Sequence, residues 1–374
     1  MKHQKKKNLQ SILKLSFFAS LVILSIVFVF HNAFLYDRPI VKIIDSSITE
    51  TEKVVDQYGN EDRISTQILT GIVQNGKQKG RNVALTNQYS YSGAYDEAYQ
   101  VGNEVFVSFH KNTVEAELMT GDITGVKRDK YTIIIAWLFI IVLLLIGKKQ
   151  GLYTSISLGL NIILLSYALD LYVQYGFNLI WVSILLTLLF TAISLLLTNG
   201  WNEKSYTAII ATIIGTLLSV GITVFVMWLT AEEGLRYEEM QFLTRPYKLI
   251  FIAGLLIGSL GAVMDVAISI STAMFELYET NKNISIQQLK QSGFNIGKDI
   301  MGTMTNILLF AYVSGSIPIL IVYLMNHSPL DFALSINLSL ELTRALAGGI
   351  GIVITIPIGL YISIFFIHRK EDKL

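Results

Sequence analysis

The chain contains no cysteine, which excludes disulfide bonds, thiolate metal sites and cysteine nucleophiles. Charged residues make up only 15% of it, too few for a soluble globular chain of 374 residues. The net charge of +1 gives no indication of a nucleic-acid partner. Histidine is also scarce, and the five histidines are scattered mostly near the ends of apolar runs, so no histidine metal cluster is expected: His3, His31, His110, His327 and His368.

Motifs of common enzyme classes are missing as well. There is no H-E-x-x-H and no G-x-S-x-G, and residues 293–299 (GFNIGKD) have neither the spacing nor the Ser/Thr of a P-loop. An aspartyl dyad would need a second carboxylate at the depth of Asp265, and no span supplies one. We therefore expect a protein that is not an enzyme, with no catalytic residue, no metal and no cofactor.

Long apolar runs are abundant, and 52% of the residues are hydrophobic. Several runs exceed the roughly 18–20 residues that span a bilayer. The predicted fold class is an α-helical polytopic membrane protein of about eight transmembrane helices, with a small all-β domain inserted between helices 1 and 2. After the first helix, the expected spans are 131–147, 151–171, 177–198, 206–229, 249–275, 300–324 and 345–367.

The N-terminus begins with a lysine-rich stretch, followed by an apolar run from Leu15 to about Phe34. This could be a signal peptide or a signal anchor. The run is long for a signal peptide, and HNAFLYDRP after it has no convincing pair of small residues for cleavage, which favours an uncleaved anchor.

Residues 36–129 are different in kind, because half of the acidic residues lie there among turn signals such as Gly59-Asn60 and Gly121-Asp122. They predict one small barrel or sandwich. Its tyrosines Tyr89, Tyr91, Tyr95 and Tyr99 either bind a ligand or, more simply, occupy turns and strand edges. The expected strands are Val41–Ile44, Ile64–Val73, Asn82–Leu85, Val105–Phe109 and Val114–Met119.

The distribution of Lys and Arg predicts a multi-pass protein of the cell membrane with both termini cytoplasmic and residues 36–129 extracytoplasmic. Lys148, Lys149, the loop 276–299 and the tail from His368 then face the cytoplasm. Within that loop, Ser285 could cap a short helix on the membrane surface. The predicted domains are the anchor at 1–35, the β-rich domain at 36–129 and a seven-helix membrane domain at 130–374.

One span carries a carboxylate, Asp265, in a row of small residues. At about 100° per residue, Gly254, Gly258, Gly261, Asp265, Ser269 and Thr272 share one helical face. Glycines at this spacing allow close helix packing in lipid. A carboxylate inside a membrane is costly and is by default a candidate functional site.

The two following spans add further polar and small residues. Asn306 and Thr305 lie in the run that begins GKDIMGTMTN, at a depth similar to that of Asp265, so Asn306 and Asp265 are plausible neighbours. Gly302, Gly348 and Gly351 are predicted packing positions. Asp265 is either a proton or cation carrier supported by Asn306, Ser269 and Thr305, or a protonated group that holds helices together by hydrogen bonds.

These residues resemble the YibE/F-like family of bacterial membrane proteins. The motifs are Gly254-x-x-x-Gly258-x-x-Gly261-Ala262-x-x-Asp265-x-Ala267-x-Ser269-Ile270-Ser271 and Gly297–Asn306, followed by Phe310-Ala311-Tyr312. Lys298 stands where Arg is expected, and Ile307 where Thr is expected. The resemblance covers residues 130–367, and the β domain by position. It implies a YibE-type chain with a paired YibF-type membrane subunit, and no established activity.

Two functions from different classes remain in view. The first is the larger subunit of a two-component permease, with the lipid bilayer, a YibF-type subunit and a small solute or ion as partners. The alternative is a non-transporting envelope receptor or scaffold that binds through the outer β domain. They differ in whether water and ions reach Asp265.

Overall fold

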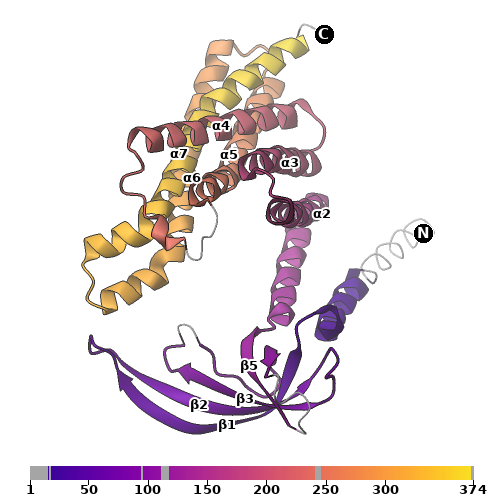
Figure 1. The fold of residues 1–374 in the computed structure, drawn as a ribbon. Helices are drawn as coiled ribbons and strands as arrows, with labels where there is room; N and C mark the ends of the chain where they lie inside the picture. The colour runs from indigo at the N-terminus through magenta and orange to yellow at the C-terminus, as the bar shows by residue number, and fades with distance from the viewer. Residues whose placement is uncertain (1–15, 17, 94–95, 111–117, 241–245, 372–374) are drawn as a thin grey trace, which may run out of the picture. The chain divides into compact units, whose positions relative to one another are not determined.

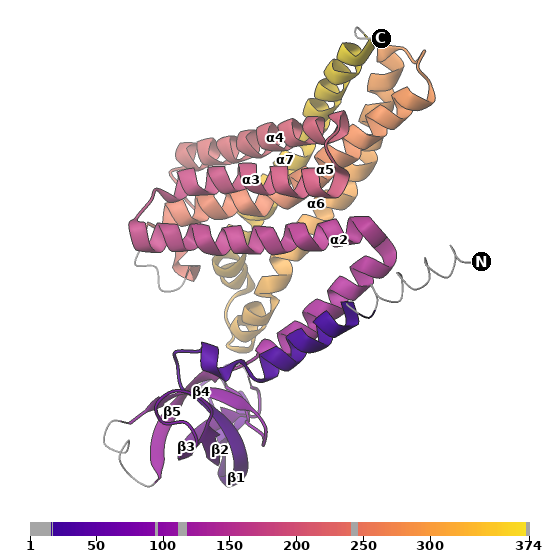
Figure 2. The same ribbon diagram turned by 90° about the vertical axis from the view of Figure 1, so that its right-hand side faces the viewer.

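The computed structural model describes residues 16, 18–93, 96–110, 118–240 and 246–371 (Figure 1). The chain divides into two compact units, residues 1–142 and 143–374. The first unit holds every strand found in the described residues, and the second is helical (Figure 1 and Figure 2).

The β domain is a closed barrel of five strands: β1 (Ile40–Val55), β2 (Glu61–Val73), β3 (Asn82–Ser90), β4 (Glu104–Phe109) and β5 (Met119–Val126). Their order is β1-β2-β3-β5-β4, with β1 pairing β4 and β3 running parallel to β5. Alternate side chains of β2 from Ser65 to Val73 point into the barrel. A small Greek-key barrel of this kind is the architecture of OB folds, and architecture alone assigns no ligand.

The last strand differs from its prediction. The expected strand at 114–119 lies mostly outside the described residues, and β5 instead runs through Gly121-Asp122, where the sequence indicated a turn. A Cβ on Gly121 would lie 2.6 Å from the backbone oxygen of Ser108 on β4. This glycine therefore permits a close approach between strands, which its presence in the sequence could not distinguish from a turn.

The tyrosine cluster is also divided. Tyr99 is buried in the barrel core, whereas 85% of Tyr91 is exposed, and Tyr95 lies outside the described residues. The four tyrosines therefore do not form one surface patch.

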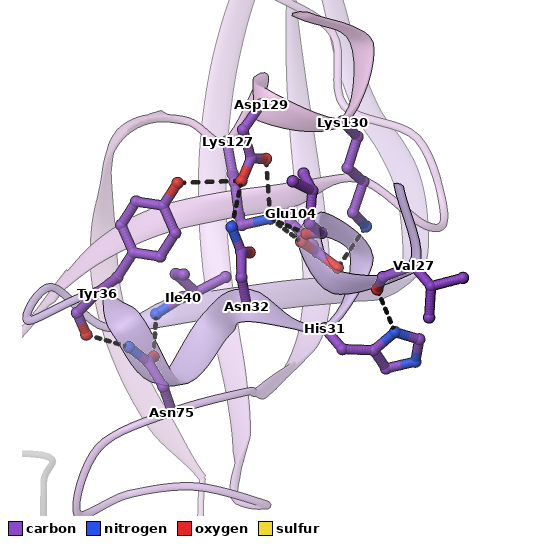
Figure 3. Close-up of polar contacts among 11 residues, drawn as sticks. Val27, His31, Asn32, Tyr36, Ile40, Asn75, Glu104, Lys127, Asp129 and Lys130 are labelled. Carbon is purple, nitrogen blue, oxygen red and sulfur yellow. Dashed lines mark hydrogen bonds and ion pairs between the residues drawn. The ribbon is translucent and has the colours of Figure 1, made fainter. Parts of the chain in front are cut away.

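A buried ionic cluster joins the barrel to the start of α2 (Asp129–Tyr175), as Figure 3 shows. The Lys127 side chain is 1% exposed, and its Nζ lies 3.3 Å from Glu104 and 2.8 Å from Asp129. Asn32 of the short helix η1 (Asn32–Leu35) and Tyr36 both donate to Asp129, at 2.9 and 3.0 Å. Burial, together with the hydrogen bond to Asp129, raises the pKa of the Tyr36 hydroxyl. The cluster thus connects the segment that enters the β domain, before β1, and the segment that leaves it, after β5, to Glu104 of β4.

The helix Phe18–Phe30 lies alongside the first part of α2 within the N-terminal unit (Figure 2). The Trp137 indole N–H donates to the Ser25 hydroxyl at 2.6 Å, and the Phe18 and Trp137 rings meet edge to face. The described part of the expected anchor is therefore an apolar helix paired with the next one.

Six helices in the described residues are long and apolar enough to cross a membrane. They are α2, α3 (Leu179–Asn199), α4 (Glu203–Leu229), α5 (Tyr247–Thr280), α6 (Ile286–Met325) and α7 (Leu330–Glu371); the short helix η3 (Tyr237–Glu239) precedes α5. The chain is thus a multi-pass membrane protein with an N-terminal β domain.

The expected count of about eight spans is not confirmed. The two spans expected at 131–147 and 151–171 correspond to the two helical arms of α2, which meet at a sharp kink at Lys148 (φ 48°, ψ −118°). The described helix Phe18–Phe30 is shorter than a full span.

Within the C-terminal unit, α5 packs against α3, α4, α6 and α7. The expected surface helix after Ser285 is not separate, because Ser285 and Gln288 form a capping box that starts α6 itself. Pro318 and Pro357 lie inside α6 and α7 without ending them. Wholly buried residues such as Val266, Ile270 and Ile352 form the core of this bundle.

Candidate functional site

Asp265 lies near the middle of α5, eighteen residues after Tyr247, or roughly 27 Å along the helix at 1.5 Å per residue. Its side chain is exposed in the isolated chain. It makes no hydrogen bond or ion pair with any residue that the structure describes. Asp265 therefore does not hold together the described helices of its own chain.

The α5 face that carries Asp265 is open around it. Gly261 is exposed, and a methyl group added to its Cα would have no atom within 4 Å, while Ser269 is half-buried. The opposite face is packed, since Val263 and Ile270 are 0% exposed. At mid-length the helix thus presents Gly261 and Asp265 outward and Val263 and Ile270 inward.

Asn306 and Thr305 occupy a different place. Both line a mainly apolar cavity of about 400 Å³ between α6 and α7. The Thr305 hydroxyl donates to the Met301 carbonyl at 2.8 Å, so it is satisfied within its own helix. The rest of the lining comes from Leu309, Ala345, Leu346, Gly349, Ile350, Val353 and Ile354.

Asp265 is not among the residues that line this cavity. Leu308 and Tyr312 of α6 pack into the core shared with α5 and α7. At 100° per residue, Asn306 lies about 160° around the helix from Leu308. The expected pairing of Asp265 with Asn306 therefore does not form within the chain, although the two residues were placed at similar depth.

The predicted packing glycines fall into two groups. Gly258 lies under the Tyr312 hydroxyl, and added methyl groups at Gly348 and Gly351 would approach Leu308 and Val263 to 2.7 Å. A methyl group at Gly254 would lie 4.0 Å from Arg344 Nε. Gly302 and Gly261, in contrast, have no such neighbour and are exposed.

Two polar features of the bundle were not expected as parts of a site. Arg344 pairs with Glu341 and also stacks over the Phe251 ring of α5, with 5.3 Å from its Cζ to the ring centroid. Thr216 and Thr355 are 0% exposed, and neither hydroxyl has a hydrogen-bond partner within the described part of the chain. The Glu341–Arg344 pair is the i, i+3 contact within α7 that the sequence spacing predicts. The contact with Phe251 and the burial of the two threonines depend on neighbouring helices, which spacing within one helix does not predict. Among the described residues, no group of three His, Asp or Glu side chains could hold a metal ion.

The fold and the candidate site together define a multi-pass membrane protein in which a small β domain precedes a helical bundle with a carboxylate at mid-helix. Family models match the chain twice: a YibE/F-like protein over residues 135–369, and the YibE/F family N-terminal domain over residues 34–126. The chain therefore belongs to the YibE/F-like family. Searches of curated proteins and of solved structures gave no significant match.

Proposed function

We propose that the chain is a transport component of the cell membrane, the larger subunit of a two-subunit permease, in which Asp265 is the proton- or cation-binding group. The observation that carries this proposal is the exposed carboxylate of Asp265 at the middle of α5, which has no partner among the residues that the structure describes. A carboxylate facing hydrocarbon is costly, so this face has to meet water or another protein in the membrane.

A paired YibF-type membrane subunit is the second part of the proposal. This subunit would pack against the open α5 face, where Gly261 allows a close approach between helices. Asp265 and Ser269 would then line a polar path between the two chains. Asn306 and Thr305 would then bind the transported solute in the cavity between α6 and α7, separately from the ion.

The absence of native cysteine permits a direct test. Single cysteines are placed at 261, 265 and 269, and intact cells expressing both subunits are treated with a small membrane-impermeant thiol reagent. The expected result is labelling at all three positions and none at the buried controls Val263 and Ile270. A cysteine at Gly234, in the loop after α4, shows that the reagent reaches the protein.

If the cysteines at 261, 265 and 269 were not labelled while the control cysteine at position 234 was, water would not reach this face, and the transport proposal would be rejected. A second arm uses proteoliposomes of the two-subunit complex with an internal pH-sensitive dye and an imposed membrane potential. Asp265→Asn should abolish proton flux while leaving complex assembly intact, whereas Asp265→Leu should impair assembly if the residue only joins the subunits.

A further inference from the structure

The β1–β2 hairpin carries two cations directly opposite each other near its turn. Lys53 is the cross-strand partner of Arg63, and both are exposed. They share a face with Thr51 and Ser65, whose hydroxyls lie 3.0 Å apart. Neither cation forms an ion pair within the part of the chain that the structure describes. Like charges directly opposite destabilise a strand pair, so stability of the fold does not account for this arrangement.

An exposed aromatic ring lies beside them. The Tyr91 amide donates to the Arg63 carbonyl at 2.9 Å, which extends β3 along β2, and 85% of Tyr91 is exposed. Lys53, Arg63 and Tyr91 line a hollow of about 420 Å³ on the barrel. The hollow therefore combines a flat ring with two adjacent cationic groups.

The two carboxylates of the hollow differ in what they contact. Asp62 accepts the Ser92 hydroxyl at 2.7 Å and the Tyr91 amide at 3.1 Å, and the hydrogen bond from Ser92 holds the pKa of Asp62 below its usual range. Glu61 also lines the hollow and makes no such contact within the described residues. Asp62 thus fixes the segment that carries Tyr91, and Glu61 is left as a free acceptor.

We propose that this hollow binds an acidic saccharide. A sugar ring would stack on Tyr91, and its carboxylate or phosphate would pair with Lys53 and Arg63 through charge-assisted hydrogen bonds. Sugar hydroxyls would donate to Glu61, so the ring, both cations and the free carboxylate of the hollow each have a role. A nucleic-acid strand fits less well, because it needs a continuous basic track and several stacking rings, whereas a carboxylate stands beside this single ring. The proposal does not depend on Asp265.

The test uses the full-length protein in detergent and isothermal titration calorimetry. The probes are trigalacturonic acid for a carboxylate, glucose 1-phosphate for a phosphate, neutral galactotriose, and a single-stranded oligo-dT. Tyr91→Ala and the double variant Lys53→Gln/Arg63→Gln are compared with Lys77→Gln/Lys79→Gln, which removes two exposed cations outside the hollow.

We expect saturable binding of at least one acidic sugar. Both hollow variants should weaken it at least about tenfold, and the Lys77/Lys79 control should leave it unchanged. Which acidic sugar binds identifies the acidic group. The Lys53/Arg63 variant should also unfold at the same or a higher temperature than the native chain, because it removes a repulsion.

Four results would overturn the proposal. The first three are no saturable binding of either acidic sugar, unchanged binding in the hollow variants, and tighter binding of galactotriose than of the acidic sugars. The fourth is a fall in the unfolding temperature of the Lys53→Gln/Arg63→Gln variant large enough to account for its weaker binding. Tighter binding of oligo-dT that depends on the same residues would assign the hollow to nucleic acid instead.

Discussion

At the residue scale, the spacing of residues around Asp265 predicts which side chains share its helical face, but not which neighbouring helix covers that face. Its spacing from Gly261 and Ser269 predicted a shared face, and the exposed and half-buried side chains on that face agree with it. Which helix covers this face was not predictable, and none of the described helices buries the carboxylate. The cost of a carboxylate in hydrocarbon is what makes its open position informative.

Gly258 gives a residue-scale prediction because it lies under the Tyr312 hydroxyl. Gly258→Val forces the two helices apart and should lower the free energy of unfolding in detergent by about 1–3 kcal/mol. Gly261→Val, on the same helix with open space around it, is the matched control and should be close to neutral. Combining Gly258→Val with Tyr312→Ala should cost less than the sum of the two single changes. Equal effects of the two valine substitutions would contradict a close contact between Gly258 and Tyr312.

At the element scale, the joint between the barrel and α2 depends on Lys127, whose side chain is almost wholly buried between Glu104 and Asp129. Lys127→Met leaves the half-buried Asp129 without a cation, whereas Glu104 keeps its ion pair with Lys130, so the change should cost about 1–3 kcal/mol of unfolding free energy. Lys77→Met on an exposed loop should change it by less than about 0.5 kcal/mol. Denaturant unfolding of the full chain in detergent measures both. If the two variants proved equally stable, the joint would not be a source of stability.

The segment 90–93 at the end of β3 should loosen in acid. Asp62 holds it through Ser92, and the hydrogen bond from Ser92 lowers the pKa of Asp62 below its ordinary 3.8. A lowered carboxyl pKa means that the stabilisation is fully present above pH 3.8 and is lost as the pH falls through the folded-state value. The protection of the Tyr91 and Ser92 amides from hydrogen exchange, measured relative to the intrinsic exchange rate at each pH, should therefore fall below that pH. In Asp62→Asn this protection should already be low at neutral pH and should not fall further in acid; an unchanged loss of protection in acid would point to another group.

At the scale of the whole molecule, the kink at Lys148 decides how often the chain crosses the membrane. If both arms of α2 cross and residues 36–129 are extracytoplasmic, as the distribution of Lys and Arg predicts, Lys149 lies on the cytoplasmic side and Asn178, before α3, lies outside. Single cysteines at these positions should then label in opposite ways: position 178 in intact cells, and position 149 only after permeabilisation. Labelling of both from outside would mean that the two arms do not cross separately.

The sequence by itself determined the class of protein, four of the five strands and the polar face of α5. These depend on local quantities: the length of an apolar run, a period of two or 3.6 residues, and the cost of a charge in lipid. The tertiary structure decided that β5 passes through Gly121, that Asn306 turns away from Asp265, and that Lys127 is buried at the joint. Each of these depends on which neighbouring element a side chain meets, and spacing within a single segment carries no information about that neighbour.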